Sequence, residues 1–156
     1  MPVTGKPFQP RELAELCHNG GFRDEDLIMA VAVCLSESGG YPRAWNDNHK
    51  LITDTKAGDI VANIELYYHF TILNPATGKV RLDNGEIETY PVTVEVITSR
   101  DVGLFQINIP ARDMGTDRED ALYDVVANVA TARQYWQTRG WQPWYGWVNG
   151  YATATE

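Results

Sequence analysis

The chain is short of basic residues. Lys and Arg total 13 against 21 Asp and Glu, which gives a formal net charge of −8 at pH 7. Binding to nucleic acid depends on clustered basic side chains, so nucleic acid is disfavoured as a partner. Long-range electrostatic attraction to an anionic surface such as a bacterial cell wall is excluded for the same reason. Any polymer that this chain binds must be held by local contacts in a groove.

Long hydrophobic runs are also missing. No stretch approaches the roughly 18 consecutive apolar residues that a membrane-spanning helix needs. The first residues, Met1–Lys6, lack the apolar centre of a secretory signal peptide. We therefore expect no membrane insertion and no signal peptide, so that export would need another route.

Cysteine is scarce, and the histidines are scattered. Cys17 and Cys34 fall on two successive predicted helices, and one pair in a chain of this length is no disulfide framework. We expect two buried thiols that act as small hydrophobic residues, with a disulfide as the alternative. His18, His49 and His69 show no ligand spacing typical of zinc. The sequence therefore predicts no metal site and no cofactor.

The length of 156 residues and the 44% hydrophobic content allow one core of moderate size. We therefore expect one domain over residues 1–156. A short helix is predicted over residues 10–21, with Pro at its start and Gly at its end. A second helix begins near Glu25, is capped by Asp24 and reaches Glu37. Its apolar stripe consists of Leu27, Ala30, Val31, Cys34 and Leu35.

A third, long helix is predicted to start at Thr116 or Asp117 and to run through Thr138. We expect it to pack against the helix that ends at Glu37. Asn128 interrupts its apolar stripe, which follows the helical period through Leu122, Val125, Val126, Val129, Ala130, Arg133 and Trp136.

Between residues 49 and 98 the hydrophobic period changes to two, which indicates strands. A loop over residues 41–48 precedes this region. The predicted strands are Ile64–Ile72, a short return at Lys79–Leu82 and a strand from Glu86 to Ile97. The turns between them are Asn74–Gly78 and Asp83–Gly85. We expect a meander of about three antiparallel strands, and hence an α+β fold.

One acid stands out at the end of the second helix. Helical steps back from Glu37 reach Cys34, Val33 and Ala30, which places the acid on the face that the helix buries. Poor solvation raises the pKa of a carboxyl group and leaves it able to donate a proton near neutral pH. The alternative is an ordinary solvated last turn before the Gly39–Gly40 C-cap.

A second stretch, Ser99–Asn108, weighs against that alternative. Gln106 and Asn108 interrupt its apolar run with amides, and buried amides need partners. Together, Glu37–Ser38 and Gly103–Asn108 resemble the lysozyme superfamily, in which a helix ends in the catalytic Glu of an E-S motif and a later G-[LI]-[FLM]-Q-[IL] segment lines the same cleft. The run from Asp101 is similar to the D-x-G-I-L-Q-I-N segment of animal lysozymes. The run Glu37–Asn46 is similar to the E-S-G-x-x-P-x-A-x-N run of soluble lytic transglycosylases and phage lysins.

The resemblance implies a single lysozyme-like domain, mainly helical, with a β-rich insert at about 49–98 that forms one wall of the cleft. It implies a glycoside hydrolase that cleaves the β-1,4 bond between N-acetylmuramic acid and N-acetylglucosamine in peptidoglycan. Glu37 would be the general acid and Asp101 the second carboxylate, while Ser38, Gln106 and Asn108 would line or support the cleft. The natural setting would be a phage lysin, or a virion component that also contacts other phage particle proteins.

Three alternatives stay open. A lytic transglycosylase would act through Glu37 alone and leave a 1,6-anhydro end, although many such enzymes lack an acid at the position of Asp101. A noncatalytic glycan-binding or virion structural protein would keep the fold without turnover. Asp101 would otherwise be the N-cap of a helix from Val102 to Ile107. If Asp101 is catalytic, a carboxyl separation of about 5–5.5 Å indicates retention and about 6.5–9.5 Å indicates inversion.

Aromatic side chains supply the remaining candidate contacts to sugar, because their faces stack on the apolar faces of sugar rings. Trp45 lies in the loop after the Glu37 helix, and its alternative role is to cover the end of that helix. The C-terminal segment contributes Tyr145, Trp147 and Tyr151 as candidate substrate-binding residues. For Trp141 and Trp144 we favour an aromatic plug that closes the core.

Overall fold

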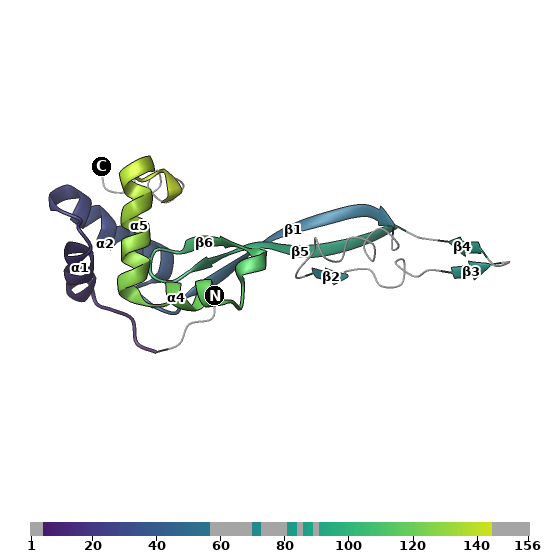
Figure 1. Cartoon of the computed structure of the whole chain (residues 1–156), viewed down its shortest axis with the longest axis horizontal. Helices are drawn as coiled ribbons and strands as arrows, with labels where there is room; N and C mark the ends of the chain where they lie inside the picture. Colours follow the sequence, from purple (N-terminus) through teal and green to yellow (C-terminus); the bar gives the residue numbers. More distant parts are fainter. Residues whose placement is uncertain (1–4, 57–69, 73–80, 84–85, 89–90, 145–156) are drawn as a thin grey trace. The chain divides into compact units, whose positions relative to one another are not determined.

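The computed structural model describes residues 5–56, 70–72, 81–83, 86–88 and 91–144, which form an α+β protein (Figure 1). The chain divides into two compact units. One consists of Met1–Asn46, Asp101–Ile109 and Asp113–Glu156, and the other of Asp47–Arg100 and Pro110–Arg112. Of the helices in the described part of the chain, none is long and apolar enough to cross a membrane.

The first unit begins with helix α1, Pro10–Asn19, as the sequence predicts. Pro10 occupies the first turn, where its missing N–H costs no hydrogen bond. The backbone N–H of Gln9 donates to Glu12 Oε1 at 3.0 Å, and Gly20 ends the helix. Helix α1 packs against the next helix, α2.

Helix α2 spans Asp24–Ser38, but Asp24 is not its cap. The N-cap is Arg23, and Asp24 is the first helical residue, with φ of 53°. The guanidinium group of Arg23 folds back and donates to the carbonyl of Phe22 at 2.8 Å. Asp24 instead adds negative charge to the first turn, where the helix dipole favours it. At the other end, Gly39 adopts the left-handed conformation of a C-cap.

The buried face of α2 consists of Ala30, Val33, Cys34 and Ser38. The predicted stripe is therefore displaced by part of a turn, because Leu35 is exposed and Leu27 and Val31 are only half-buried. Cys34 and Cys17 are buried free thiols, which confirms the prediction, and the alternative disulfide is not formed. Burial first, and then the neighbouring Cys17 thiol, raise the pKa of Cys34 well above its ordinary value.

The first strand starts earlier than predicted. Strand β1 spans Trp45–Lys56, so the second half of the predicted loop is a strand. Strand β5 spans Pro91–Val102, and β2 spans Phe70–Ile72 at the end of the predicted Ile64–Ile72 strand, the rest of which lies outside the described residues. The sheet is antiparallel and has the order β1–β5–β2, with Phe70 opposite Val96.

In the second unit, side chains link β1 to β5. Arg100 donates to both carboxylate oxygens of Asp47, at 2.6 Å and 3.1 Å. Asn48 Nδ2 donates to Ser99 Oγ at 3.0 Å. These partners lie more than 50 positions apart in the chain, so local patterns gave no sign of β1.

The predicted strand from Glu86 to Ile97 is in fact two strands. The first part is β4, Glu86–Glu88, which pairs with β3, Arg81–Asp83, on the other side of the predicted turn. Asp83 lies opposite Glu86 and Arg81 opposite Glu88, the register expected when two residues connect the strands. The predicted turn Asn74–Gly78 lies outside the described residues.

Strand β6, Ile107–Pro110, pairs with β5, and residues 103–106 form a turn between them. The alternative of a helix from Val102 to Ile107 capped by Asp101 is therefore wrong. Beyond β6, Ala111–Asp113 forms a short 3-10 helix, η2.

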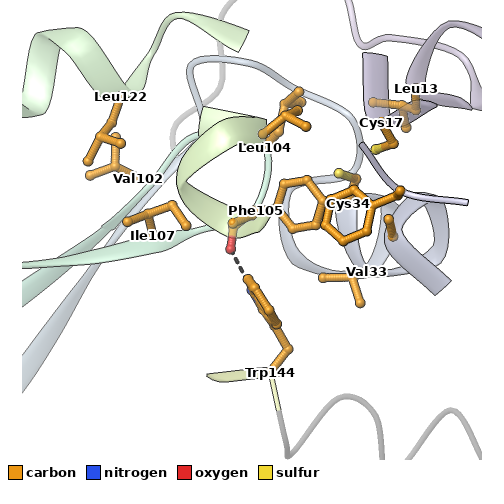
Figure 2. Packing of buried hydrophobic residues seen from close by; sticks show 14 of the residues in the cluster. Leu13, Cys17, Val33, Cys34, Val102, Leu104, Phe105, Ile107, Leu122 and Trp144 are labelled. Carbon is orange, nitrogen blue, oxygen red and sulfur yellow. Dashed lines mark hydrogen bonds between the residues drawn. The ribbon is translucent and has the colours of Figure 1, made fainter. Parts of the chain in front are cut away.

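The core of the first unit surrounds this turn (Figure 2). Phe105 inserts from the turn among side chains of α1 and α2, and Trp144 Nε1 donates to its carbonyl at 2.8 Å. The cluster includes Leu13, Cys17, Phe22, Val33, Cys34, Val102, Leu104, Phe105, Ile107, Leu122, Val129 and Trp144.

The predicted long helix is broken in two. Helix α4 spans Asp117–Leu122 and helix α5 spans Val125–Arg139, with Asp124 as the N-cap of α5. Asp124 Oδ2 accepts a hydrogen bond from Ala127 N at 3.0 Å. Helix α5 packs against α1, α4 and the 3-10 helix η3, Gln142–Trp144. The sequence predicted packing against the helix that ends at Glu37.

The buried face of α5 also differs from the predicted apolar stripe. Asn128, Val129 and Ala132 are buried, whereas Ala130 is exposed and Val126 is 67% exposed. The predicted stripe is thus wrong at Val126 and Ala130. Asn128, which was predicted to interrupt the stripe, is a core residue.

Asn128 forms three hydrogen bonds with the backbone around it. Its Oδ1 accepts from Phe105 N at 2.9 Å, and its Nδ2 donates to the carbonyls of Val102 and Leu122, both at 2.9 Å. A Cβ at Gly103 would overlap both this amide and the Leu122 carbonyl, and Gly103 has φ of +77°. Both the contact and the backbone conformation therefore require glycine there.

We expect Asn128→Ala to lower the free energy of unfolding by about 3 kcal/mol, because three backbone groups lose a buried partner. Val126→Ala on the exposed face of the same helix is the control, with an expected change within about 0.5 kcal/mol. Urea denaturation measures both. Equal small losses would show that the Asn128 amide is not needed to hold the turn.

Candidate active site

A cavity of about 320 Å³ opens in the first unit and brings together residues from five elements and a turn. Glu37, Asp101, Gln106 and Asn108, all candidate site residues from the sequence, line this one cavity. Among the described residues, the lining consists of Glu37, Asp101, Gln106, Ile107, Asn108, Tyr135, Arg139, Pro143 and Trp144.

Glu37 reaches the cavity from the last turn of α2. Its side chain is half-buried, and Cys34, one turn earlier, is fully buried. Burial raises the pKa of the Glu37 carboxyl group above its ordinary value, and the negative charge of Asp101 raises it further. The acid is thus biased toward its protonated form, which can donate a proton.

Asp101 enters from the end of β5. Side chains alternate along a strand, so the burial of Val102 in the core places Asp101 on the opposite side. Asp101 Oδ1 accepts a hydrogen bond from Asn108 Nδ2 at 2.9 Å. The same alternation leaves Asn108 exposed between buried Ile107 and Ile109, so the expectation that its amide is buried is wrong.

Gln106 holds the turn between Asp101 and Asn108. Its Nε2 donates to the carbonyl of Ala44 at 3.1 Å and to that of Gly103 at 3.0 Å. Its φ of 49° is unusual for a residue other than glycine and costs about 1 kcal/mol. Such strain persists only where surrounding contacts hold it, so the side chain and the backbone of Gln106 are both fixed.

Two predicted site residues are placed elsewhere. Ser38 is 1% exposed, and its hydroxyl donates to the Cys34 carbonyl at 2.9 Å and accepts from Gly40 N at 3.2 Å. Trp45 begins β1 and does not line the cavity. Tyr145, Trp147 and Tyr151 lie outside the described residues.

The aromatic plug is confirmed for Trp141 and Trp144. Trp144 is buried, and its ring centroid lies 5.6 Å from those of both Phe105 and Trp141. Trp141 stacks on Phe22 at 5.7 Å, and its Nε1 donates to Asp26 Oδ1 at 3.3 Å. The plug also forms part of the cavity wall through Trp144.

The cavity combines a protonatable acid, a second carboxylate and two amides, a set suited to acid catalysis on a polar substrate. The chain matches no protein-family model, no curated protein and no solved structure. Within the residues that the structure describes, no group of three or more His, Cys, Asp or Glu side chains could hold a metal ion.

Sequence reasoning missed Tyr135 and Arg139, which line the cavity from the second half of α5. The Arg139 guanidinium lies 4.6 Å from the centroid of the Tyr135 ring. The spacing of four residues is a signal that could have found this pair, since it places both on one helix face.

The raised pKa of Glu37 predicts a cost to folding stability. The folded state binds this proton more tightly than the unfolded chain does, so stability falls as pH rises from about the ordinary value of 4.5 through the folded-state pKa. We expect Glu37→Gln to melt at a higher temperature than the wild type at pH 8 and at nearly the same temperature at pH 4.

Calorimetry across that pH range measures the difference. Glu15→Gln, at an exposed position of α1, is the control and should show no such gain. A melting difference for Glu37→Gln that does not change with pH would contradict the assignment of a raised pKa.

Proposed function

We propose that this protein is a peptidoglycan-cleaving glycoside hydrolase with a lysozyme-like fold, acting on the β-1,4 bond between N-acetylmuramic acid and N-acetylglucosamine. The observation that carries the proposal is the half-buried Glu37 with a raised pKa in a cavity that it shares with Asp101. The resemblance of the Glu37–Ser38 and Gly103–Asn108 stretches to the lysozyme superfamily supports it.

In this mechanism Glu37 protonates the glycosidic oxygen as the bond to the leaving sugar breaks. Positive charge then develops on the anomeric carbon, and the Asp101 carboxylate stabilises it. Asn108 holds the Asp101 carboxylate in place through its 2.9 Å hydrogen bond. A water molecule adds its hydroxyl group to the anomeric carbon, and its second proton restores the acid form of Glu37.

A lytic transglycosylase acting on the same bond is the second candidate. The observation that favours it is the bond from Asn108 to Asp101, which also gives Asp101 a purely structural reason to be present. Glu37 alone would then serve as acid and base, and the product would carry a 1,6-anhydro end. In either form, the setting we propose is a phage lysin or a virion component that acts on the bacterial cell wall.

The first test compares the wild type with Glu37→Gln on a peptidoglycan suspension. We expect the variant to clear the suspension at least about 100-fold more slowly, because it cannot donate the proton. Glu15→Gln should clear it at the wild-type rate. Equal clearing by Glu37→Gln would remove the catalytic assignment, and binding without clearing by the wild type would favour a noncatalytic glycan-binding protein.

Mass spectrometry of the released sugar ends separates the two candidate reactions. A reducing N-acetylmuramic acid end is the expected product of hydrolysis. An anhydro end would instead establish the transglycosylase.

The second test concerns Asp101. We expect Asp101→Asn to reduce hydrolysis severely, because the developing positive charge loses its counterion. Removing the negative charge also lowers the pKa of Glu37, so residual activity should fall off at a lower pH than in the wild type. Measuring clearing rates from pH 4 to pH 9 tests both effects. A wild-type rate and profile would reassign Asp101 to a structural partner of Asn108.

A further inference from the structure

The cavity contains one basic side chain among the nine described residues that line it, Arg139. It stands there with two acids, Glu37 and Asp101, in a chain with a net charge of −8. Arg139 is exposed, and within the described part of the chain its guanidinium makes no ion pair and donates no hydrogen bond. Its donors are therefore available to a ligand in the cavity.

Tyr135 restricts where this group points. The guanidinium lies 4.6 Å from the centroid of the ring of Tyr135, which is itself half-buried one turn earlier on α5. Stacking of this kind occupies the face of the guanidinium and leaves the N–H groups at its edge free. Less side-chain freedom is then lost when those N–H groups bind a ligand.

A planar guanidinium with free edge donors matches a carboxylate, which it can bind through two parallel hydrogen bonds. Neutral polymers of N-acetylglucosamine carry no such group. Peptidoglycan does, either in the lactyl group of N-acetylmuramic acid where no peptide is attached or in the attached peptide.

We infer that Arg139, held by Tyr135, forms a carboxylate-binding subsite that selects acidic amino-sugar polymers over neutral ones. This inference rests on the proposed function, since it specifies the substrate of the same cavity. The subsite acts in binding and takes no part in the bond-breaking step, so its loss should change KM and leave kcat unchanged.

The kinetic test uses three substrates: intact peptidoglycan fragments, glycan strands stripped of peptide, and a neutral chitooligosaccharide. We expect Arg139→Gln to raise KM by about tenfold or more on a substrate whose carboxylate it binds. KM for the chitooligosaccharide should stay within twofold, and Arg139→Lys should recover part of the loss. Loss on stripped strands assigns the lactyl carboxylate, and loss on intact fragments alone assigns the peptide.

Arg112→Gln, at an exposed Arg outside the cavity, is the matched control and should behave as the wild type. Equal changes on neutral and acidic substrates, or no change on either, would overturn the inference.

A binding experiment separates this inference from the proposed function. Calorimetric affinities of Glu37→Gln and of Glu37→Gln with Arg139→Gln for the same three ligands require no turnover. A tenfold loss confined to acidic ligands supports the subsite even if the wild type cleaves nothing, in which case only the proposed function fails. Equal affinities of the two proteins for acidic ligands overturn the subsite even if the wild type is active.

Discussion

The buried amide of Asn128 is the contact on which the rest of the site depends. It binds the backbone on both sides of Gly103, at the Val102 carbonyl and the Phe105 N–H, and ties both to the Leu122 carbonyl. Asp101 immediately precedes this turn and Asn108 follows it. One side chain of α5 thus sets the path of the segment that carries much of the cavity wall.

The same amide explains two features that look unrelated in the sequence. The Leu122 carbonyl lies at the end of α4 and bonds to a side chain, so the chain can leave the helix there without burying an unsatisfied acceptor. Glycine is required at position 103 because the amide occupies the space that a Cβ would take. The helix break and the glycine are therefore consequences of one packing arrangement.

Local patterns were sufficient for elements whose stabilising contacts are close in sequence. Pro10 and Gly20 mark α1, and the Asp83–Gly85 turn signal marks the β3–β4 hairpin. Local patterns failed where the deciding contact is distant. The pairing of Asp47 with Arg100 accounts for the early start of β1, and the three bonds of Asn128 account for the split between α4 and α5.

For the site, too, local motifs were sufficient for some residues and failed for others. Glu37, Asp101, Gln106 and Asn108 were selected from two short motifs, and the structure brings all four to one cavity. Ser38 was selected with them, but its hydroxyl is used at the end of α2. Tyr135 and Arg139 could not be connected to the motifs from the sequence, because the fold alone brings α5 to the cavity.

Charge acts differently at long and short range in this molecule. At physiological ionic strength, interactions between exposed charges are largely screened beyond about 8 Å. Beyond that distance the net charge of −8 acts only weakly on an anionic polymer. Arg139 acts only on a group that has already entered the cavity. Because Arg139 forms no pair with Glu37, it does not offset the burial and the negative charge that raise the pKa of the acid. Within the proposed function, one cavity thus holds an acid with a raised pKa and a cation without an ion-pair partner among the described residues, each facing a different part of the substrate.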